Sequence, residues 1–285
     1  MTTLQKLALA RLASRMVCAA RGLAGLKSRI VCRRGGVLWD LDLSEGVDFA
    51  IYLFGSFEPE VVAACRRLCP EGGICLDVGA NIGAHTLPLA SLAGPQGQVH
   101  AFEPTDFAFQ KLRRNLSLNP ELSSRIEASQ VFLGETLSQP VPEKVPAAWP
   151  LRAGADLDPL HGGRAESLTG CRRDTLDDWM LRTNPARIDL LKLDVDGHEI
   201  EVLGGAERLL QTHRPRMIVE FAPYVFSEKP CGFQGLVELL RDHGYEARTL
   251  KGKALPLDSS LETLIPHGSG VNAVLTSRDD LFRAG

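Results

Sequence analysis

The hydrophobic positions of this chain follow two periods, one typical of buried strands and one typical of helices. From residue 74 onward, short apolar runs are followed by stretches in which apolar residues lie three or four positions apart. The predicted elements are, in order, strand 74–78, helix 82–93, strand 98–102, helix 107–118, strand 126–133, strand 188–193, helix 199–210, strand 217–221, helix 233–243, strand 245–250 and strand 271–276. This alternation predicts an α/β fold, a doubly wound and mostly parallel sheet with helices on both faces.

The first 70 residues follow a different pattern. The predicted elements are a helix over 4–23, a hairpin with strands 30–32 and 37–43, and a helix over 58–68. Gly35-Gly36 supplies the turn of the hairpin. We therefore expect residues 1–70 to form an N-terminal helix, hairpin and cap, and residues 71–285 to form the main domain.

Between Gly134 and Gly170 the periodicity disappears. Five prolines in this stretch interrupt any regular element, so we predict a long insertion over 134–170. Loops of this length are usually functional lids or disordered segments, and the sequence does not decide between the two.

Composition narrows the class of partner and the compartment. A net charge of −3 gives no general attraction to phosphate backbones, so we expect no nucleic acid and favour a small-molecule, sugar or lipid-linked partner. The seven cysteines are odd in number and scattered, and Cys75 lies in an apparent buried strand. This pattern predicts neither a disulfide framework nor a metal site and favours a cytoplasmic location. No apolar run approaches the roughly 18 residues that would span a bilayer.

The first 34 residues contain eight lysines and arginines and no acidic residue. Two interpretations stay open. The charge is typical of a segment that contacts a membrane surface or directs targeting. The helical spacing of the apolar residues favours a basic helix packed on the domain or on a partner chain. The oligomeric state is not determined by the sequence.

A glycine-containing turn follows the first strand of the main domain, in the segment Asp77-Val78-Gly79-Ala80-Asn81-Ile82-Gly83. Glycines at such a turn allow a ligand to approach the backbone, and the helix that follows offers free N–H groups. The spacing differs from the G-x-G-x-x-G that accommodates a pyrophosphate. Asp77 also favours a positively charged ligand over a diphosphate.

A second carboxylate, Glu103 in Phe102-Glu103-Pro104, ends the next strand, where it can accept hydrogen bonds from both hydroxyls of a ribose. Together, the acidic turn and the acidic strand end describe a cationic nucleoside without phosphate, S-adenosylmethionine. The predicted cofactor-binding residues are Asp77, Gly79, Ala80, Asn81, Gly83, Glu103 and Pro104.

These features resemble the FkbM family of S-adenosylmethionine-dependent methyltransferases over roughly residues 37–276. The resemblance is carried by Trp39 to Leu43, Phe57-Glu58-Pro59-Glu60, the cofactor turn, Ala101 to Pro104, Asn115, Asn119, Thr175-Leu176-Asp177, Leu191 to Gly197, Leu203 to Ala206, Arg214-Pro215 and Ile218-Val219-Glu220. It implies a class I methyltransferase fold with an antiparallel last strand, and methyl transfer typically to a hydroxyl oxygen. The chain departs from the family at Asp196, where glutamate is common.

The strand over 188–193 ends in a polar cluster that we expect to face the methyl donor. Asp194, Asp196 and His198 are the predicted catalytic residues, because methyl transfer to a hydroxyl needs positioning and a group that takes the proton. His198 is the candidate base by its ordinary pKa. The alternative is that His198 merely occupies the first turn of a helix, with Asp196 as its N-cap.

The resulting hypothesis is an O-methyltransferase acting on a hydroxyl of a sugar, a lipid-linked glycan or a secondary metabolite. Two alternatives remain open. One is a non-catalytic module that binds S-adenosylmethionine and acts through its basic N-terminal helix, and the other is an NAD-dependent oxidoreductase.

Overall fold

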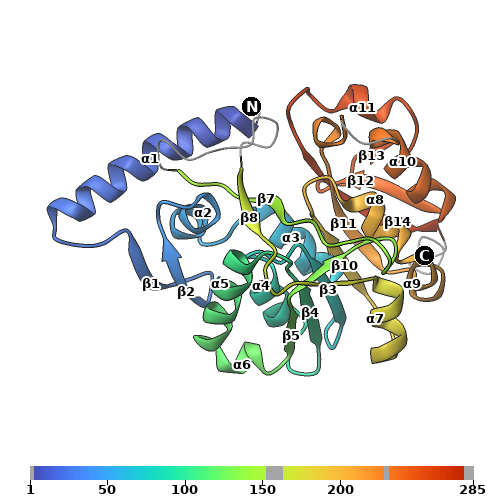
Figure 1. The fold of residues 1–285 in the computed structure, drawn as a ribbon, viewed down its shortest axis with the longest axis horizontal. Helices are drawn as coiled ribbons and strands as arrows, with labels where there is room; N and C mark the ends of the chain where they lie inside the picture. Colours follow the sequence, from blue (N-terminus) through green and yellow to red (C-terminus); the bar gives the residue numbers. More distant parts are fainter. Residues whose placement is uncertain (1–2, 152–162, 228–230, 279–285) are drawn as a thin grey trace.

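An eight-stranded sheet forms the centre of the computed structural model, which describes residues 3–151, 163–227 and 231–278 (Figure 1). Across the sheet, the strands are β13 (Ala254–Leu255), β12 (Tyr245–Thr249), β14 (Val271–Ser277), β11 (Arg216–Phe221), β10 (Leu190–Leu193), β3 (Ile74–Val78), β4 (Gln98–Phe102) and β5 (Ile126–Ser129). The five strands from β5 to β11 run parallel, and β14 is antiparallel to both of its neighbours. The predicted doubly wound sheet and its antiparallel last strand are confirmed.

Helices cover both faces of this sheet, because alternate residues of each strand point to opposite sides. On β3, Leu76 and Val78 face α7 (Leu176–Thr183), α8 (Glu199–Gly204), α9 (Glu207–His213) and α10 (Gly232–Asp242). Cys75 faces the other side, where α3 (Pro59–Leu68) and α4 (Thr86–Leu92) pack. The short helices are α6 (Pro120–Ser123), η1 (Pro223–Phe226) and α11 (Leu261–Leu264).

The N-terminal elements are α1 (Thr3–Leu23), β1 (Arg29–Arg34), β2 (Val37–Asp42) and α2 (Gly46–Phe54). The predicted helix and hairpin are present, whereas α2 was not predicted. Trp39 of β2 and Ile51 of α2 are buried in a hydrophobic cluster that continues into α5 (Asp106–Ser117). One face of α1 packs on this cluster, so the N-terminal segment contacts the main domain directly.

The predicted insertion over 134–170 contains regular structure that its prolines concealed. β7 (Lys144–Ala148) and β8 (Arg164–Ser167) form an antiparallel hairpin with a register shift at Pro146. At its borders, β6 (Val131–Leu133) pairs in parallel with β9 (Arg172–Asp174). The expectation that no regular element forms here was wrong, because a bulge accommodates proline within a short strand. Residues 152–162 of the insertion lie outside the described residues.

Three predicted elements are shorter than expected. The helix predicted over 82–93 begins only at Thr86, and the strand predicted over 126–133 is divided at Gln130. The helix predicted over 199–210 breaks at Gly205, whose backbone lies against another segment: a Cβ there would lie 2.1 Å from the Gly134 carbonyl oxygen, and its carbonyl accepts a hydrogen bond from the Asp177 N–H. Close contact with another segment ends this helix, which local periodicity cannot reveal.

No helix in the described ranges combines the length and apolar character needed to cross a membrane.

Two asparagines, Asn115 of α5 and Asn119 just before α6, join the hairpin to the main domain. The Asn115 side chain accepts a hydrogen bond from the Asp40 N–H at 2.9 Å and donates one to the Ile82 carbonyl at 2.9 Å. Asn119 accepts from the Leu38 N–H and donates to the Leu38 carbonyl. The outer edge of β2 is therefore paired by side chains instead of by another strand.

Replacing Asn115→Ala removes both bonds and leaves the two backbone groups unpaired. We expect the free energy of unfolding to fall by about 2–4 kcal/mol in urea denaturation. Ser117→Ala, an exposed position of the same helix, is the control and should change it by less than about 0.5 kcal/mol. Equal stabilities of the two variants would contradict this role of Asn115.

Candidate active site

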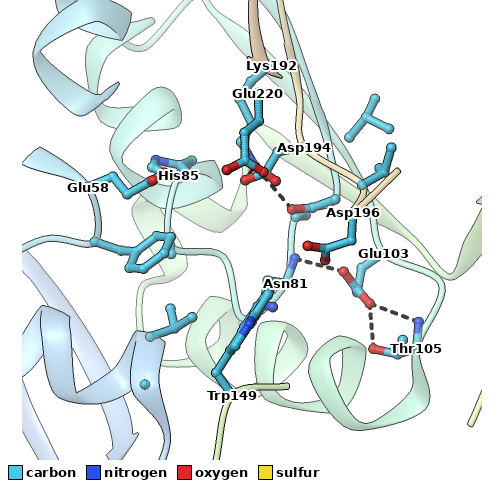
Figure 2. A pocket seen from close by; sticks show the side chains of 18 of the residues that line it. Glu58, Asn81, His85, Glu103, Thr105, Trp149, Lys192, Asp194, Asp196 and Glu220 are labelled. Atoms are coloured by element: carbon cyan, nitrogen blue, oxygen red, sulfur yellow. Dashed lines mark hydrogen bonds and ion pairs between the residues drawn. The ribbon is translucent and has the colours of Figure 1, made fainter. Parts of the chain in front are cut away.

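A cavity of about 660 Å³ lies at the carboxyl ends of β3, β4, β10 and β11. The strand order reverses between β3 and β10, which is where ligands bind in doubly wound sheets. The volume lies within the range of small-molecule and cofactor sites. Figure 2 shows carboxylate side chains from several strand ends around this cavity, with Trp149 on another side.

The turn after β3 is held in place by backbone contacts. The N–H groups of Gly79 and Ala80 both donate to the Phe102 carbonyl at 3.0 Å. Gly79 has a φ of +80°, and a Cβ there would lie 1.8 Å from the Asp194 carbonyl oxygen. Only glycine allows this turn to touch the loop after β10.

The second glycine of the turn has a different role from the predicted one. Gly83 does not line the cavity, and a Cβ at this position would lie 2.8 Å from Cδ1 of Leu112 on α5. The sequence assigned Gly83 to the cofactor, whereas its surroundings explain it by helix packing.

Glu103 is held rigidly at the end of β4 (Figure 2). Its Oε2 accepts a hydrogen bond from the Asn81 N–H at 2.9 Å, and its Oε1 accepts from the N–H and the hydroxyl of Thr105. Burial raises the pKa of Glu103, and these hydrogen bonds offset the effect only in part. The carboxylate is therefore oriented before any ligand arrives.

Lys192 connects the first strand to the acidic loop. The register of β10 and β3 places Lys192 opposite Asp77. Its Nζ lies 3.1 Å from Asp194 Oδ2, 3.8 Å from Asp77 Oδ1 and 3.4 Å from the Gly79 carbonyl oxygen. Burial lowers the pKa of Lys192, but Asp194, Asp77 and Glu58 together outweigh it and raise the pKa above its ordinary value.

Asp77 itself is fully buried and does not line the cavity. Its Oδ2 accepts a hydrogen bond from the Thr86 hydroxyl at 2.6 Å. The sequence placed Asp77 against the cationic end of the cofactor, whereas the structure places it beside Lys192 and the start of α4. Asp77 can therefore affect a ligand by holding Lys192.

Three carboxylates from two strand ends meet in the cavity. One oxygen each of Asp194, Asp196 and Glu220 lies within 4.8 Å of the others. Burial and the neighbouring carboxylates raise the pKa of both Asp196 and Glu220 well above ordinary values. Such a group could hold a divalent cation or the positive part of a ligand. We expected no metal site from the pattern of the cysteines, which carries no information on carboxylates that converge from separate strands.

His198 lines the cavity at the position that precedes α8, with its ring 5.3 Å from the Phe132 ring in an edge-to-face arrangement. His198 occupies the N-cap position of α8, which the alternative interpretation of the sequence assigned to Asp196. The following residue, Glu199, is buried, and its Oε1 accepts from the N–H groups of Val195 and Gly197. Glu199 thereby fixes the bend of the loop that carries the three predicted catalytic residues.

The structure brings most of the predicted site residues together. Those that line the cavity are Gly79, Ala80, Asn81, Glu103, Pro104, Asp194, Asp196 and His198. Asp77 and Gly83 lie outside its wall.

The sequence did not identify several residues that line the same cavity. His85 is buried at the cavity wall, with its Nε2 3.4 Å from Glu58 Oε2. Burial by itself would raise the pKa of Glu58, but His85 and Lys192 outweigh it, so the pKa is lowered. The Phe57-Glu58-Pro59 segment carried part of the family resemblance and was therefore a signal in the sequence for a role of Glu58. No signal in the sequence pointed to Trp149, which belongs to the insertion.

Comparison with known proteins identifies the class. The profile of the Methyltransferase FkbM domain family matches residues 77–247, more than half of the chain. The chain belongs to this family and is a methyltransferase, as the sequence predicted. Family membership agrees with S-adenosylmethionine as the cofactor.

Two relatives and one solved structure illustrate the similarity. Methyltransferase sdnD of Sordaria araneosa is 29% identical over 219 residues, which are 68% of this chain and 82% of the relative. Hexuronic acid methyltransferase AglP of Haloferax volcanii is 26% identical over 155 residues, 54% of this chain and 59% of the relative. The crystal structure of methyltransferase FkbM from Methylobacillus flagellatus KT is 17% identical, with 72% of this chain and 44% of that chain covered and a TM-score of 0.42.

Glu199 gives the protein a pH-dependent stability. Burial raises its pKa from the ordinary 4.5 to about 7, so the folded state retains a proton that the unfolded chain has lost. This contribution is complete below about pH 4.5 and is lost as the pH rises through about 7. Glu199→Gln should be as stable as wild type in acid and about 3 kcal/mol more stable above pH 7.

Thermal denaturation at a series of pH values measures this difference. Glu121→Gln replaces an exposed carboxylate and is the control, which should follow the wild-type profile. Parallel profiles of wild type and Glu199→Gln would show that Glu199 does not titrate in this window.

Proposed function

We propose that this protein transfers a methyl group from S-adenosylmethionine to a hydroxyl oxygen of a sugar, a lipid-linked glycan or a secondary metabolite. One observation carries the proposal. Five carboxylates line the cavity, from Glu58, Glu103, Asp194, Asp196 and Glu220. Within the described part of the chain, Lys192 is the one lysine or arginine among the lining residues. A ligand with a net positive charge relieves this imbalance, whereas a dinucleotide with two phosphates would increase it.

The donor side is formed by the turn after β3 and by Glu103. Oε1 of Glu103 already accepts two hydrogen bonds from Thr105, whereas Oε2 accepts one, from Asn81, and keeps a lone-pair site for a ribose hydroxyl. Gly79, Ala80 and Asn81 line the wall beside it. Asp77 acts indirectly, because it holds Lys192 on the side of the acidic loop.

The acceptor side is formed by the loop after β10 and by Glu220. S-adenosylmethionine supplies the electrophilic methyl group. Asp194, Asp196 and Glu220 face the positive charge of the donor, and His198 takes the proton of the acceptor hydroxyl. A positive ligand also lowers the raised pKa values of Asp196 and Glu220 and so favours the charged form of both carboxylates.

The class of acceptor has support from one relative and from the cavity wall. The name of the Haloferax volcanii relative describes a hexuronic acid methyltransferase, which supports a sugar acceptor. The cavity also continues along apolar side chains of α2, among them Phe49 and Leu53, which supports an acceptor with an apolar part.

The two alternative functions differ in their support. Membership in a methyltransferase family argues against an NAD-dependent oxidoreductase. Only product formation distinguishes the proposed enzyme from a module that binds the cofactor without catalysis.

Calorimetry with S-adenosylmethionine tests the donor site. Glu103→Gln removes the charge that accepts the ribose hydrogen bonds, and we expect the affinity to fall about 10- to 100-fold. Glu127→Gln changes an exposed carboxylate on neighbouring β5 and should bind like wild type. Equal affinities for Glu103→Gln and wild type, with both proteins folded, would reject the assignment of Glu103.

Transfer of a deuterated methyl group to acceptors in a cell extract, followed by mass spectrometry, tests catalysis. We expect a mass-shifted product whose rate of formation falls about 100-fold or more in His198→Ala, with cofactor affinity unchanged. The exposed His267→Ala is the control. Retained turnover in His198→Ala at every pH would exclude His198 as the base. Donor binding without any product would favour the non-catalytic module.

A further inference from the structure

The outward face of α1 is apolar. Its most exposed large apolar side chains are Leu9, Leu12, Met16 and Leu23, which are 58%, 60%, 67% and 93% exposed. Their spacing of three, four and seven residues places all four on one side of the helix. The opposite side packs on the domain, where the buried Ser14 hydroxyl donates to the Leu43 carbonyl at 2.6 Å. A helix of an isolated domain normally shows the reverse arrangement, so this face has the character of a docking surface.

The charge around this face identifies the kind of partner. Residues 1–39 hold eight of the 32 lysines and arginines and none of the 35 acidic residues. The rest of the chain therefore carries 24 basic against 35 acidic side chains. Arg15 is exposed on α1, and Lys27 is exposed beyond its end. A negatively charged surface complements this segment, whereas a second copy of α1 would bring like charges together.

The same face continues into the entrance of the cavity. Leu9 of α1 and Leu53 and Phe54 of α2 are exposed and also line the cavity. Figure 1 shows α1 along one edge of the molecule, beside α2 and away from the central sheet. The apolar surface and the cavity entrance therefore open in the same region.

We propose that α1 lies in the surface of an anionic lipid bilayer, with Leu12, Met16 and Leu23 inserted and the basic side chains near the lipid headgroups. This arrangement presents the cavity entrance to the bilayer. The docking deepens the proposed function, because it gives the acceptor a lipid part that enters the cavity past Leu9 and Phe54. It rests on the proposed function only for this acceptor. Docking on the bilayer itself requires no methyl transfer.

Flotation of the full chain with vesicles tests the docking. One set of vesicles is phosphatidylcholine alone, and the other contains about 30% phosphatidylglycerol, an anionic lipid. We expect binding to the anionic vesicles and a loss of more than about tenfold in the double variant Leu12→Glu/Met16→Glu, because two apolar insertions are replaced by charges. Arg15→Glu should weaken binding less than the double variant does. The loss caused by Arg15→Glu should become smaller still at high salt, because salt screens the charge.

Leu181→Glu is the matched control, since Leu181 is 55% exposed on α7 and lies outside the cavity wall. It should float like wild type. Three results would overturn the proposal: no flotation of wild type, equal flotation with both kinds of vesicle, or unchanged binding in the double variant. Light scattering without lipid can give a fourth result that overturns the proposal. If wild type is a dimer and the double variant is a monomer, a second copy of the chain covers α1. Failure of flotation with intact methyl transfer would leave the proposed function standing.

Discussion

The arrangement of the site depends on the buried ammonium group of Lys192. The register of β3 and β10 places it opposite Asp77, and it also reaches Asp194 and the backbone of the turn after β3. A buried carboxylate such as Asp77 is costly without a partner of opposite charge. Lys192 provides that partner and leaves the carboxylates of the cavity wall in excess. The sheet register therefore decides both the stability of this region and the charge that a ligand meets.

Backbone contact makes the two halves of the site a single unit. Gly79 touches the carbonyl of Asp194, so the turn that follows β3 packs directly against the acidic loop after β10. Glu103 fixes Asn81 on one side, and Glu199 fixes the bend at Val195 and Gly197 on the other. These contacts position polar groups before a ligand binds, which is what transfer between two bound molecules requires.

The central sheet and the added segments contribute different walls. The strand ends supply the charged groups, whereas α1, α2 and the insertion supply apolar side chains, with Trp149 among them. The apolar outer face of α1 adjoins the cavity entrance, which relates the choice of acceptor to the surface on which the protein would act.

The sequence by itself determined the order of most strands and helices of the central sheet, the family, and the residues at the two strand ends. Those features depend on local periodicity and on motifs contiguous in the chain, such as Phe102-Glu103-Pro104. It did not reveal the orientation of Asp77, the packing role of Gly83 or the convergence of Asp196 with Glu220. Each depends on contacts between segments far apart in the chain, which only the tertiary structure brings together. The same reason explains why Glu58, His85 and Trp149 became recognisable as parts of one cavity only in the folded protein.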